Sequence, residues 1–248
     1  MRRYWALSLA ATREVVRNRV GLFFTFVFPL IFLVTFGLLF GHQKDGTTPY
    51  INYIGPGILA WAVGNGALFG VAYTLMHWRK NDLLRVIRMT PITVPEVLGA
   101  RGLVALGVGI CQAVFFVVIS ALPFFGMTLS RWSIATLPVV ALGVCAFFAM
   151  GLLVGTYASS SEAIAAIANC IMVPMAFLSG TFFPVNAAPG WVQGISRAMP
   201  LRYMIDGLSV LPGSNGPHVV IVPCLVLIGF TVVFGLFATR LFRWSSEA

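Results

Sequence analysis

The chain has 248 residues, of which 59% are hydrophobic and only 9% are charged, and its mean hydropathy is +0.93. Soluble domains average about 25% charged residues, so this composition excludes an ordinary soluble protein and predicts a polytopic membrane protein. Because one crossing takes about 20 residues, the length accommodates six spans with short connections but no sizeable aqueous domain. The net charge of +9 therefore indicates contact with anionic lipid headgroups and not with nucleic acid.

The N-terminal segment, residues 3–19, is predicted to form an amphipathic helix along the membrane surface. Trp5, Leu9, Thr12 and Val16 recur at helical spacing on one face, and the arginines gather on the opposite face. Such a helix places its apolar face in lipid and its arginines toward the headgroups. The alternative is a basic tail that only sets the orientation of the first span.

Six apolar runs follow, and each predicts a membrane-spanning helix. The runs cover residues 20–40, 54–76, 102–125, 134–157, 163–180 and 218–239. Glycines four residues apart, which permit close contact between helices, occur in two runs and at the end of the first: Gly66 and Gly70, Gly151 and Gly155, and Gly37 and Gly41. The predicted fold class is an all-α polytopic membrane protein, with a single transmembrane domain over residues 1–248.

The distribution of basic residues predicts the orientation in the membrane. Of the 16 Lys and Arg residues, 12 lie before span one, between spans two and three, or after span six. Cytoplasmic connections carry the excess of such residues, so both termini are predicted to face the cytoplasm. The predicted location is the cell membrane, inner or plasma, with multiple passes, and the even number of spans agrees with this topology.

The sequence contains no recognisable catalytic centre. No predicted span carries a charged side chain, whereas ion-coupled carriers generally need ionisable groups at membrane depth. The chain lacks the Gly-Lys-[Ser/Thr] phosphate-binding loop, and its histidines and cysteines show no metal-ligand spacing. We therefore expect no catalytic residue, metal or cofactor in this chain, and we expect any transport to draw its energy from another subunit.

The connection between spans two and three, residues 77–101, is the most charged segment of the chain. Leu83, Val86 and Ile87 have helical spacing, and Thr90-Pro91 ends the helix. A short cytoplasmic helix with apolar and charged faces suits docking into a groove of a partner protein. The alternative is a segment that only covers the bilayer surface and fixes the topology. The candidate docking residues are Asp82, Leu83, Leu84, Arg85, Val86, Arg88, Thr90 and Pro91.

Residues 181–216, before the last span, are interrupted by Pro and Gly too often for a spanning helix. They are also too apolar for a water-exposed loop, so we expect a re-entrant hairpin of short helices in the outer leaflet. Arg202 and Asp206 are four residues apart and can pair across one helical turn, either to hold the hairpin together or to gate an outer exit. The candidate gate residues are Phe182, Phe183, Arg202, Tyr203 and Asp206.

The order of these segments resembles the membrane subunit of ABC-2 type exporters over essentially the whole chain. The stretches that carry the resemblance are Gly55-Pro56-Gly57-Ile58-Leu59, Thr90-Pro91, Gly180-Thr181-Phe182-Phe183-Pro184, Pro189-Gly190-Trp191 and Pro200-Leu201-Arg202-Tyr203. Members of this family have an interfacial helix, six spans, a cytoplasmic coupling helix after span two and a re-entrant hairpin before span six. One departure is Arg79-Lys80-Asn81, where the family often has Glu-Gly before the coupling helix, and it bears on how the partner docks.

The resemblance implies a permease that exports a hydrophobic or amphipathic molecule, such as a drug, an antibiotic or a lipid-like compound. It implies two copies of a separate subunit that binds ATP and Mg²⁺ and pushes on the coupling helix, and a second permease that is an identical copy or a paralogue. The implied pathway follows spans one, two and five, whose candidate residues are also ordinary packing or lipid-facing types: Phe23, Phe26, Phe28, Tyr73, Asn169, Met172, Met175 and Phe177.

Two functions from other classes remain open at this point. A membrane enzyme acting on lipid would need carboxylates or histidines clustered at one interface, and the sequence shows only isolated ones. A ligand-sensing membrane scaffold would bind a molecule without moving it.

Overall fold

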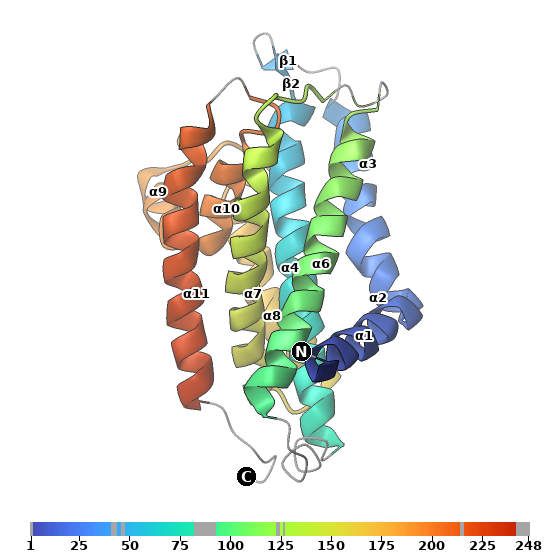
Figure 1. Ribbon diagram of the computed structural model, residues 1–248. Helices are drawn as coiled ribbons and strands as arrows, with labels where there is room; N and C mark the ends of the chain where they lie inside the picture. Colours follow the sequence, from blue (N-terminus) through green and yellow to red (C-terminus); the bar gives the residue numbers. More distant parts are fainter. Residues whose placement is uncertain are drawn as a thin grey trace.

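The computed structural model describes residues 2–40, 44–45, 48–81, 93–122, 125, 127–213 and 216–241. The chain forms a bundle of long helices (Figure 1). Six described helices are long and apolar enough to cross a membrane: Arg19–Leu39, Ile51–Lys80, Glu96–Ser120, Ser133–Tyr157, Ser161–Leu178 and His218–Arg240. The all-α class and the six predicted spans are thereby confirmed.

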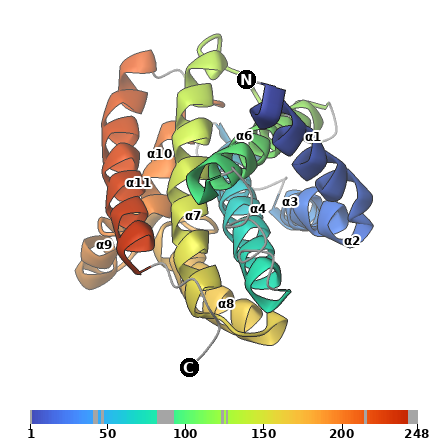
Figure 2. The same cartoon turned by 60° about the horizontal axis from the view of Figure 1, so that its bottom comes forward.

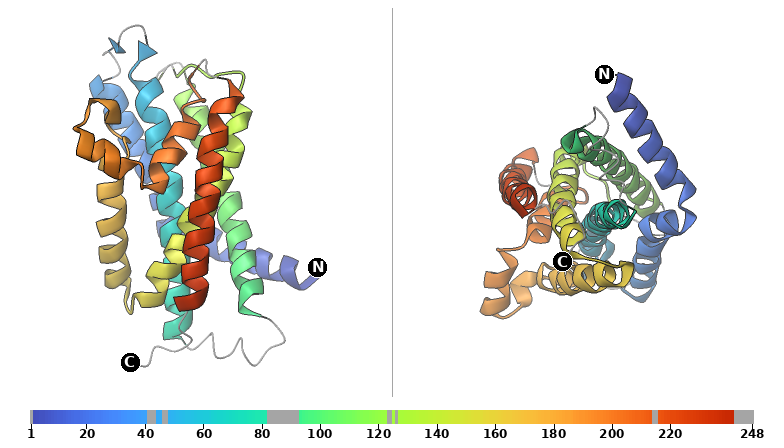
Figure 3. Two further views of the ribbon diagram at one scale, coloured as in Figure 1. Left: turned by 90° about the vertical axis from the view of Figure 1, so that its left-hand side faces the viewer. Right: turned by 90° about the horizontal axis from the view of Figure 1, so that it is seen from below.

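The first three helical elements form an arm at one side of the bundle. Helix α1 (Arg2–Arg17) lies crosswise to the spans and stands out from them in Figure 3. The backbone leaves helical geometry at Asn18, whose side-chain oxygen accepts a hydrogen bond of 2.9 Å from the Gly21 N–H and caps α2 (Arg19–Leu22). A π-helical stretch, η1 (Phe23–Val27), follows. We call residues 2–27 the N-terminal arm. Helix α3 (Phe28–Phe40) continues the first membrane span, which begins in the arm.

Helices α4 (Ile51–Lys80) and α7 (Leu137–Tyr157) form the centre of the bundle, side by side in Figures 1 and 2. A Cβ added to Gly151 would lie 2.5 Å from Val71 Cγ1, and one added to Gly155 would lie 2.8 Å from the Ala72 carbonyl oxygen. Since lipid provides no hydrophobic drive for helix association, such close packing is what joins two spans. The predicted glycine pair of span four is therefore a true helix contact.

Two helix ends extend past the predicted spans. Basic residues in the last turn of a helix interact favourably with its dipole, and α4 continues through Arg79 to Lys80. Helix α6 (Val94–Ser120) begins after Thr93, which forms a capping box in which its N–H donates to Glu96 Oε2 at 2.8 Å. Arg101, expected in the connection, therefore lies within α6. Residues 82–92 are outside the described part of the chain.

The segment before the last span contains broken helices, as its composition predicts. After α8 (Ser161–Leu178) come η3 (Val185–Ala187), α9 (Gly190–Ser196), α10 (Pro200–Leu208) and η4 (Pro217–Val220), and then α11 (Ile221–Leu241). Helix α10 packs against α4, α7 and α11, and Leu201, Met204 and Leu208 are fully buried. That this hairpin enters the outer leaflet stays a prediction.

The connections gather at two opposite ends of the bundle. Helix α1, the last turn of α4 and the first turns of α6 lie at one end, together with the end of α11 (Figure 1). The opposite end holds η2 (Ser133–Thr136) and the paired two-residue strands β1 (Lys44–Asp45) and β2 (Thr48–Pro49). The helix ends that carry the basic residues thus lie at the same end of the bundle. That this end faces the cytoplasm stays a prediction from the distribution of Lys and Arg.

Candidate functional site

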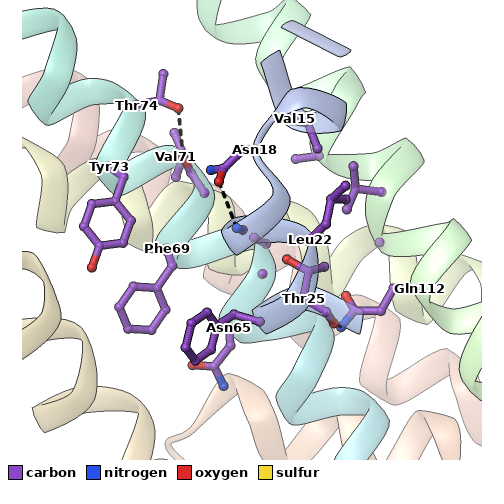
Figure 4. Close-up of a pocket in the computed structure, with 18 of the residues that line it drawn as sticks. Val15, Asn18, Leu22, Thr25, Asn65, Phe69, Val71, Tyr73, Thr74 and Gln112 are labelled. Atoms are coloured by element: carbon purple, nitrogen blue, oxygen red, sulfur yellow. Dashed lines mark hydrogen bonds between the residues drawn. The ribbon is translucent and has the colours of Figure 1, made fainter. Parts of the chain in front are cut away.

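A cavity of about 910 Å³ lies between the N-terminal arm and helices α4, α6 and α8 (Figure 4). The arm contributes Val15, Asn18 and Leu22 to one wall, and α4 contributes the opposite wall. Small-molecule sites typically enclose about 300–1,000 Å³ and are mainly apolar with a few placed polar groups. This cavity has that size and that character.

Three predicted pathway residues line the cavity, namely Phe28, Tyr73 and Asn169. The structure places the other five away from its lining, in the buried core or elsewhere on the bundle: Phe23, Phe26, Met172, Met175 and Phe177. Spans one, two and five all contribute, as the resemblance implies, and span three contributes as well. One residue in the sequence could have indicated that span three contributes to the cavity. Gln112 is the only amide in the apolar run 102–125.

The polar end of the cavity lies beside α1. The Glu14 carboxylate pairs with the Arg101 guanidinium, and the guanidinium carbon lies 5.3 Å from the centroid of the Trp78 ring. The three residues come from α1, α6 and α4. This cluster therefore joins the arm to the last turn of α4, next to the predicted docking segment.

A proline in span one explains the polar contact in the middle of the cavity. Pro29 has no N–H, so the carbonyl four residues earlier, that of Thr25, loses its usual helical partner. Gln112 Nε2 donates to this carbonyl at 2.6 Å across the gap between spans one and three. Gln112 is only 2% exposed, and burial of a polar group is tolerated because it is hydrogen-bonded. Thr25 lies in a short π-helical stretch, and single π-helical turns within α-helices often occur at functional sites.

Aromatic rings occupy the end of the cavity nearest the hairpin. Phe28 and Trp61 line the cavity, and their ring centroids are 6.3 Å apart. Phe182, from the hairpin, lies 6.3 Å from Trp61 and 5.5 Å from Phe36. The Trp61 indole N–H is buried among these groups and has no partner within the described residues. We call Phe28, Phe32, Phe36, Trp61 and Phe182 the aromatic cluster.

Two tyrosines of α4 and its N-cap hold the start of the hairpin. Tyr50 donates from its hydroxyl to the Phe182 carbonyl at 2.8 Å, and Tyr53 donates to the Gly180 carbonyl at 2.7 Å. Gly180 has φ of +88°, a left-handed conformation that favours glycine. The ring of Phe182 is thus positioned through its backbone by α4. Phe183 lies beside Phe177, with ring centroids 6.3 Å apart.

The predicted pair on α10 is present. Arg202 Nε lies 2.9 Å from Asp206 Oδ2, and Tyr203 donates to the Arg197 carbonyl at 2.8 Å. Burial raises the pKa of the Asp206 carboxyl above its ordinary value, although the Arg202 guanidinium opposes the shift. None of these side chains lines the cavity, so the structure places them with the hairpin and away from the cavity walls.

Arg79 connects the end of α4 to the end of α7. Its Nη1 donates to the carbonyls of Gly155, at 3.2 Å, and Thr156. These carbonyls belong to the last turn of α7, where no helical N–H is left to bond them. The positive charge also suits the negative end of the helix dipole. The basic residue by which this chain departs from the family pattern thus caps a neighbouring helix.

The candidate docking residues lie outside the described part of the chain: Asp82, Leu83, Leu84, Arg85, Val86, Arg88, Thr90 and Pro91. Within the described ranges, no three His, Cys, Asp or Glu side chains are grouped so that they could hold a metal ion. The described lining offers a ligand apolar surface and hydrogen-bonding groups.

Comparison with known proteins agrees with this architecture. The sequence profile of the family "ABC-2 type transporter" matches residues 2–211. The chain is 29% identical to Nodulation protein J of Rhizobium meliloti (strain 1021), over 97% of this chain and 91% of that protein. It is 25% identical to the inner membrane transport permease YadH of Escherichia coli (strain K12), over 99% of this chain and 96% of that protein. The chain belongs to the ABC-2 type transporter family, whose members are the membrane subunits of ABC transporters and work with a separate ATP-binding subunit.

Proposed function

We propose that this chain exports a hydrophobic or amphipathic molecule through the cavity, with ATP hydrolysed by the separate subunit. The observation that carries the proposal is the cavity itself, which has a polar end beside α1 and an aromatic end beside the hairpin. An amphiphile fits both ends because its tail buries apolar surface against the rings while its head stays near polar groups.

The charge distribution supports the direction of transport. The polar end of the cavity lies at the end of the bundle that carries the basic segments, which we assign to the cytoplasm. Cargo would reach the cavity from the cytoplasm or the inner leaflet. It would leave when the aromatic cluster separates, with Phe182 moving as part of the hairpin. Arg202 and Asp206 would act there as a pair that stabilises the hairpin.

Two arginine contacts support a route from the ATP-binding subunit to the cavity. Each of two ATPase copies, carrying ATP and Mg²⁺, would dock on residues 82–91 of one permease, between the ends of α4 and α6. A push there would reach α7 through Arg79 and the N-terminal arm through Arg101. Because the arm forms one wall of the cavity, its movement would change access to the bound cargo. A second permease, identical or related, would face the same cavity from across the complex.

The test of the pathway is a side chain that fills the cavity. Gly70 lines the cavity, and a Cβ added there meets nothing within 4 Å. We expect Gly70→Trp to abolish ATP-dependent uptake of a fluorescent amphiphile into inverted vesicles that contain the chain and its co-purifying ATPase. The matched control is Gly229→Trp on α11, which has equally open surroundings and lies outside the cavity lining. Equal uptake by both variants would refute a pathway through this cavity.

Docking is tested separately with a charge in the predicted apolar face. We expect Leu83→Asp to reduce co-purification of the ATPase and ATP hydrolysis by the complex, with unchanged abundance of the permease. Glu247→Gln, which changes a charge outside residues 82–91, is the control. If the ATPase binds the Leu83→Asp chain normally, residues 82–91 are not the docking segment. If no ATPase binds the wild-type chain, a lipid enzyme or a ligand-sensing scaffold replaces the exporter.

A further inference from the structure

Two amide side chains in the middle of the cavity present the same kind of atom to a ligand. Gln112 Nε2 donates to the Thr25 carbonyl at 2.6 Å, and Asn65 Nδ2 donates to the Trp61 carbonyl at 2.8 Å. A backbone carbonyl only accepts, so these contacts fix which side-chain atom is the nitrogen. Both amides thus use a donor within the protein and leave the carbonyl oxygen, Oε1 or Oδ1, as an acceptor.

Both oxygens belong to cavity-lining residues and lack a hydrogen-bond donor in the described part of the chain. Within the described residues, neither oxygen accepts a hydrogen bond, and neither is among the buried polar atoms that lack a partner. Gln112 Oε1 lies above Gly66, where an added Cβ would be 3.5 Å away. Gly66 has no side chain to cover this oxygen on the α4 side, and Asn65 is the preceding residue on α4. Figure 4 shows the Asn65 side chain on α4 and the Gln112 side chain on α6, with Thr25 of the arm between them.

The described lining has no unpaired full charge. Its carboxylate, Glu14, and its guanidinium, Arg101, form an ion pair. His77 is engaged by the Tyr73 carbonyl, 2.9 Å from Nδ1. A charged head brought to Asn65 and Gln112 would lose hydration without meeting a counter-charge, which is costly at membrane depth. An anion would in addition face two acceptor oxygens.

The Trp61 indole N–H does not change this chemistry. It is the buried donor at the aromatic end, and it is covered by neighbouring groups. Two polar atoms in the middle of the cavity, Gln112 Oε1 and Asn65 Oδ1, are therefore neutral acceptors to which no described residue donates.

We infer that the cavity selects an amphiphile whose head is uncharged and donates hydrogen bonds, through hydroxyl or amide N–H groups, to Gln112 Oε1 and Asn65 Oδ1. This inference rests on the proposed function, because it assigns the class of cargo to the same cavity. The Glu14–Arg101 pair keeps the polar end neutral, and the aromatic cluster receives the chain of the amphiphile.

The inference is tested with probes that share one tail and differ only in the head. The full chain is reconstituted in phosphatidylcholine nanodiscs, and binding of tritiated 1-dodecanoylglycerol is measured against empty nanodiscs. Competitors are its dimethyl ether, which has no donors, dodecyl sulfate and dodecylammonium. We expect the ether and both ions to compete at least about tenfold less well than the diol, because each lost hydrogen bond contributes about 0.5–1.5 kcal/mol and the ether loses two. Equal competition by the ether, or stronger competition by either ion, would overturn the inference.

Substitutions then locate the selectivity. We expect Gln112→Met to weaken binding of the diol about tenfold, while Gln193→Met has no effect. Gln193 is the matched control because it also donates to a backbone carbonyl, that of Ala188 at 2.9 Å, but lies on α9 outside the lining. Since Gln112→Met also removes the partner of the Thr25 carbonyl, Gly66→Ala is the variant that preserves the fold. Its Cβ approaches Oε1 at an ordinary contact distance, and we expect it to reduce the difference between the diol and the ether.

The outcomes separate this inference from the export proposal. If Gly70→Trp blocks ATP-driven uptake but the wild-type chain prefers a charged probe, the cargo class is wrong and the pathway stands. If Gln112→Met and Gln193→Met bind the diol equally, Gln112 is not part of the binding site. If the selectivity holds but Gly70→Trp transports normally, the cavity binds neutral amphiphiles without exporting them.

Discussion

The central pair α4–α7 and the N-terminal arm both belong to the membrane bundle, but they are held in different ways. Within the most apolar 18 residues of each span, 61% are buried in the α4 span and 56% in the α7 span, against 11% in the span that begins in the arm. The central pair is joined by backbone contacts at Gly151 and Gly155. The arm is held by side-chain contacts, namely the apolar packing of α1 against α6 and α4, the Glu14–Arg101 ion pair and the Gln112–Thr25 hydrogen bond.

This difference indicates which part of the molecule can move. Two helices whose backbones are in contact can move little relative to each other without separating. Even a small increase in side-chain volume at the contact is therefore destabilising. Individual polar contacts between side chains contribute less and can be exchanged for contacts with water, headgroups or cargo. The cavity lies at the boundary between the two regions, so a rigid α4 wall faces a movable arm wall. The predictions below test that division, beginning with the largest effect.

The strongest test of the central pair is Gly151→Leu. A Cβ there already meets Val71 Cγ1 at 2.5 Å, so α4 and α7 must separate, at a cost of about 3 kcal/mol. We expect a large fall in the unfolding temperature of the purified chain, measured by tryptophan fluorescence. Gly235→Leu on α11, where a Cβ meets nothing within 4 Å, is the control. Similar melting of the two variants would show that α4 and α7 are not joined closely.

The next test removes the cap between the ends of the central pair. Arg79→Met leaves the Gly155 and Thr156 carbonyls without their donor, and we expect a loss of about 1–2 kcal/mol in unfolding free energy. We also expect ATP hydrolysis by the complex to continue while uptake falls, because the push would no longer reach α7. Arg13→Met, on the exposed face of α1, should change neither. Parallel loss of hydrolysis and uptake would assign Arg79 to docking instead.

More of the fold than of the site could be predicted from the sequence. The spans follow from hydropathy, whereas the site depends on contacts between residues far apart in the chain. Hydropathy located all six spans, since lipid demands about 20 apolar residues for each. It missed the last turn of α4 and the first turns of α6, because hydrogen bonding and the Thr93 cap continue a helix past its apolar part. Charged residues such as Arg101 therefore lie on helices and not in a loop.

The site depended on contacts that spacing alone does not specify. Gly66 and Gly70 have the same spacing as Gly151 and Gly155, yet they line the cavity while the second pair joins two helices. The glycine spacing identifies a helix face that lacks bulky side chains. It does not identify what packs against that face. Gln112 was visible as a lone amide, and its role follows only once Pro29 and Thr25 are seen across from it.

A smaller effect is expected where α4 meets the hairpin. Tyr53→Phe removes the hydrogen bond to the Gly180 carbonyl, and we expect a loss of about 1 kcal/mol in unfolding free energy. If the hairpin is part of the outer gate, uptake should fall more than stability does, because the Phe182 ring is no longer positioned. Tyr157→Phe is the control, since Tyr157 is exposed at the end of α7. Unchanged uptake would make this bond purely structural.

The smallest effect on stability, and the sharpest test of the division, is Glu14→Gln. The Glu14 side chain is 59% exposed, so loss of its ion pair with Arg101 should cost less than about 1 kcal/mol. Amide hydrogen exchange in α1 should nevertheless become faster, because this ion pair joins α1 to α6, whereas exchange in α7 should stay the same. Arg13→Gln, without this ion pair, is the control. Faster exchange in α7 as well would mean that the arm and the central pair open as one unit, and a movable wall beside a rigid one would no longer describe the cavity.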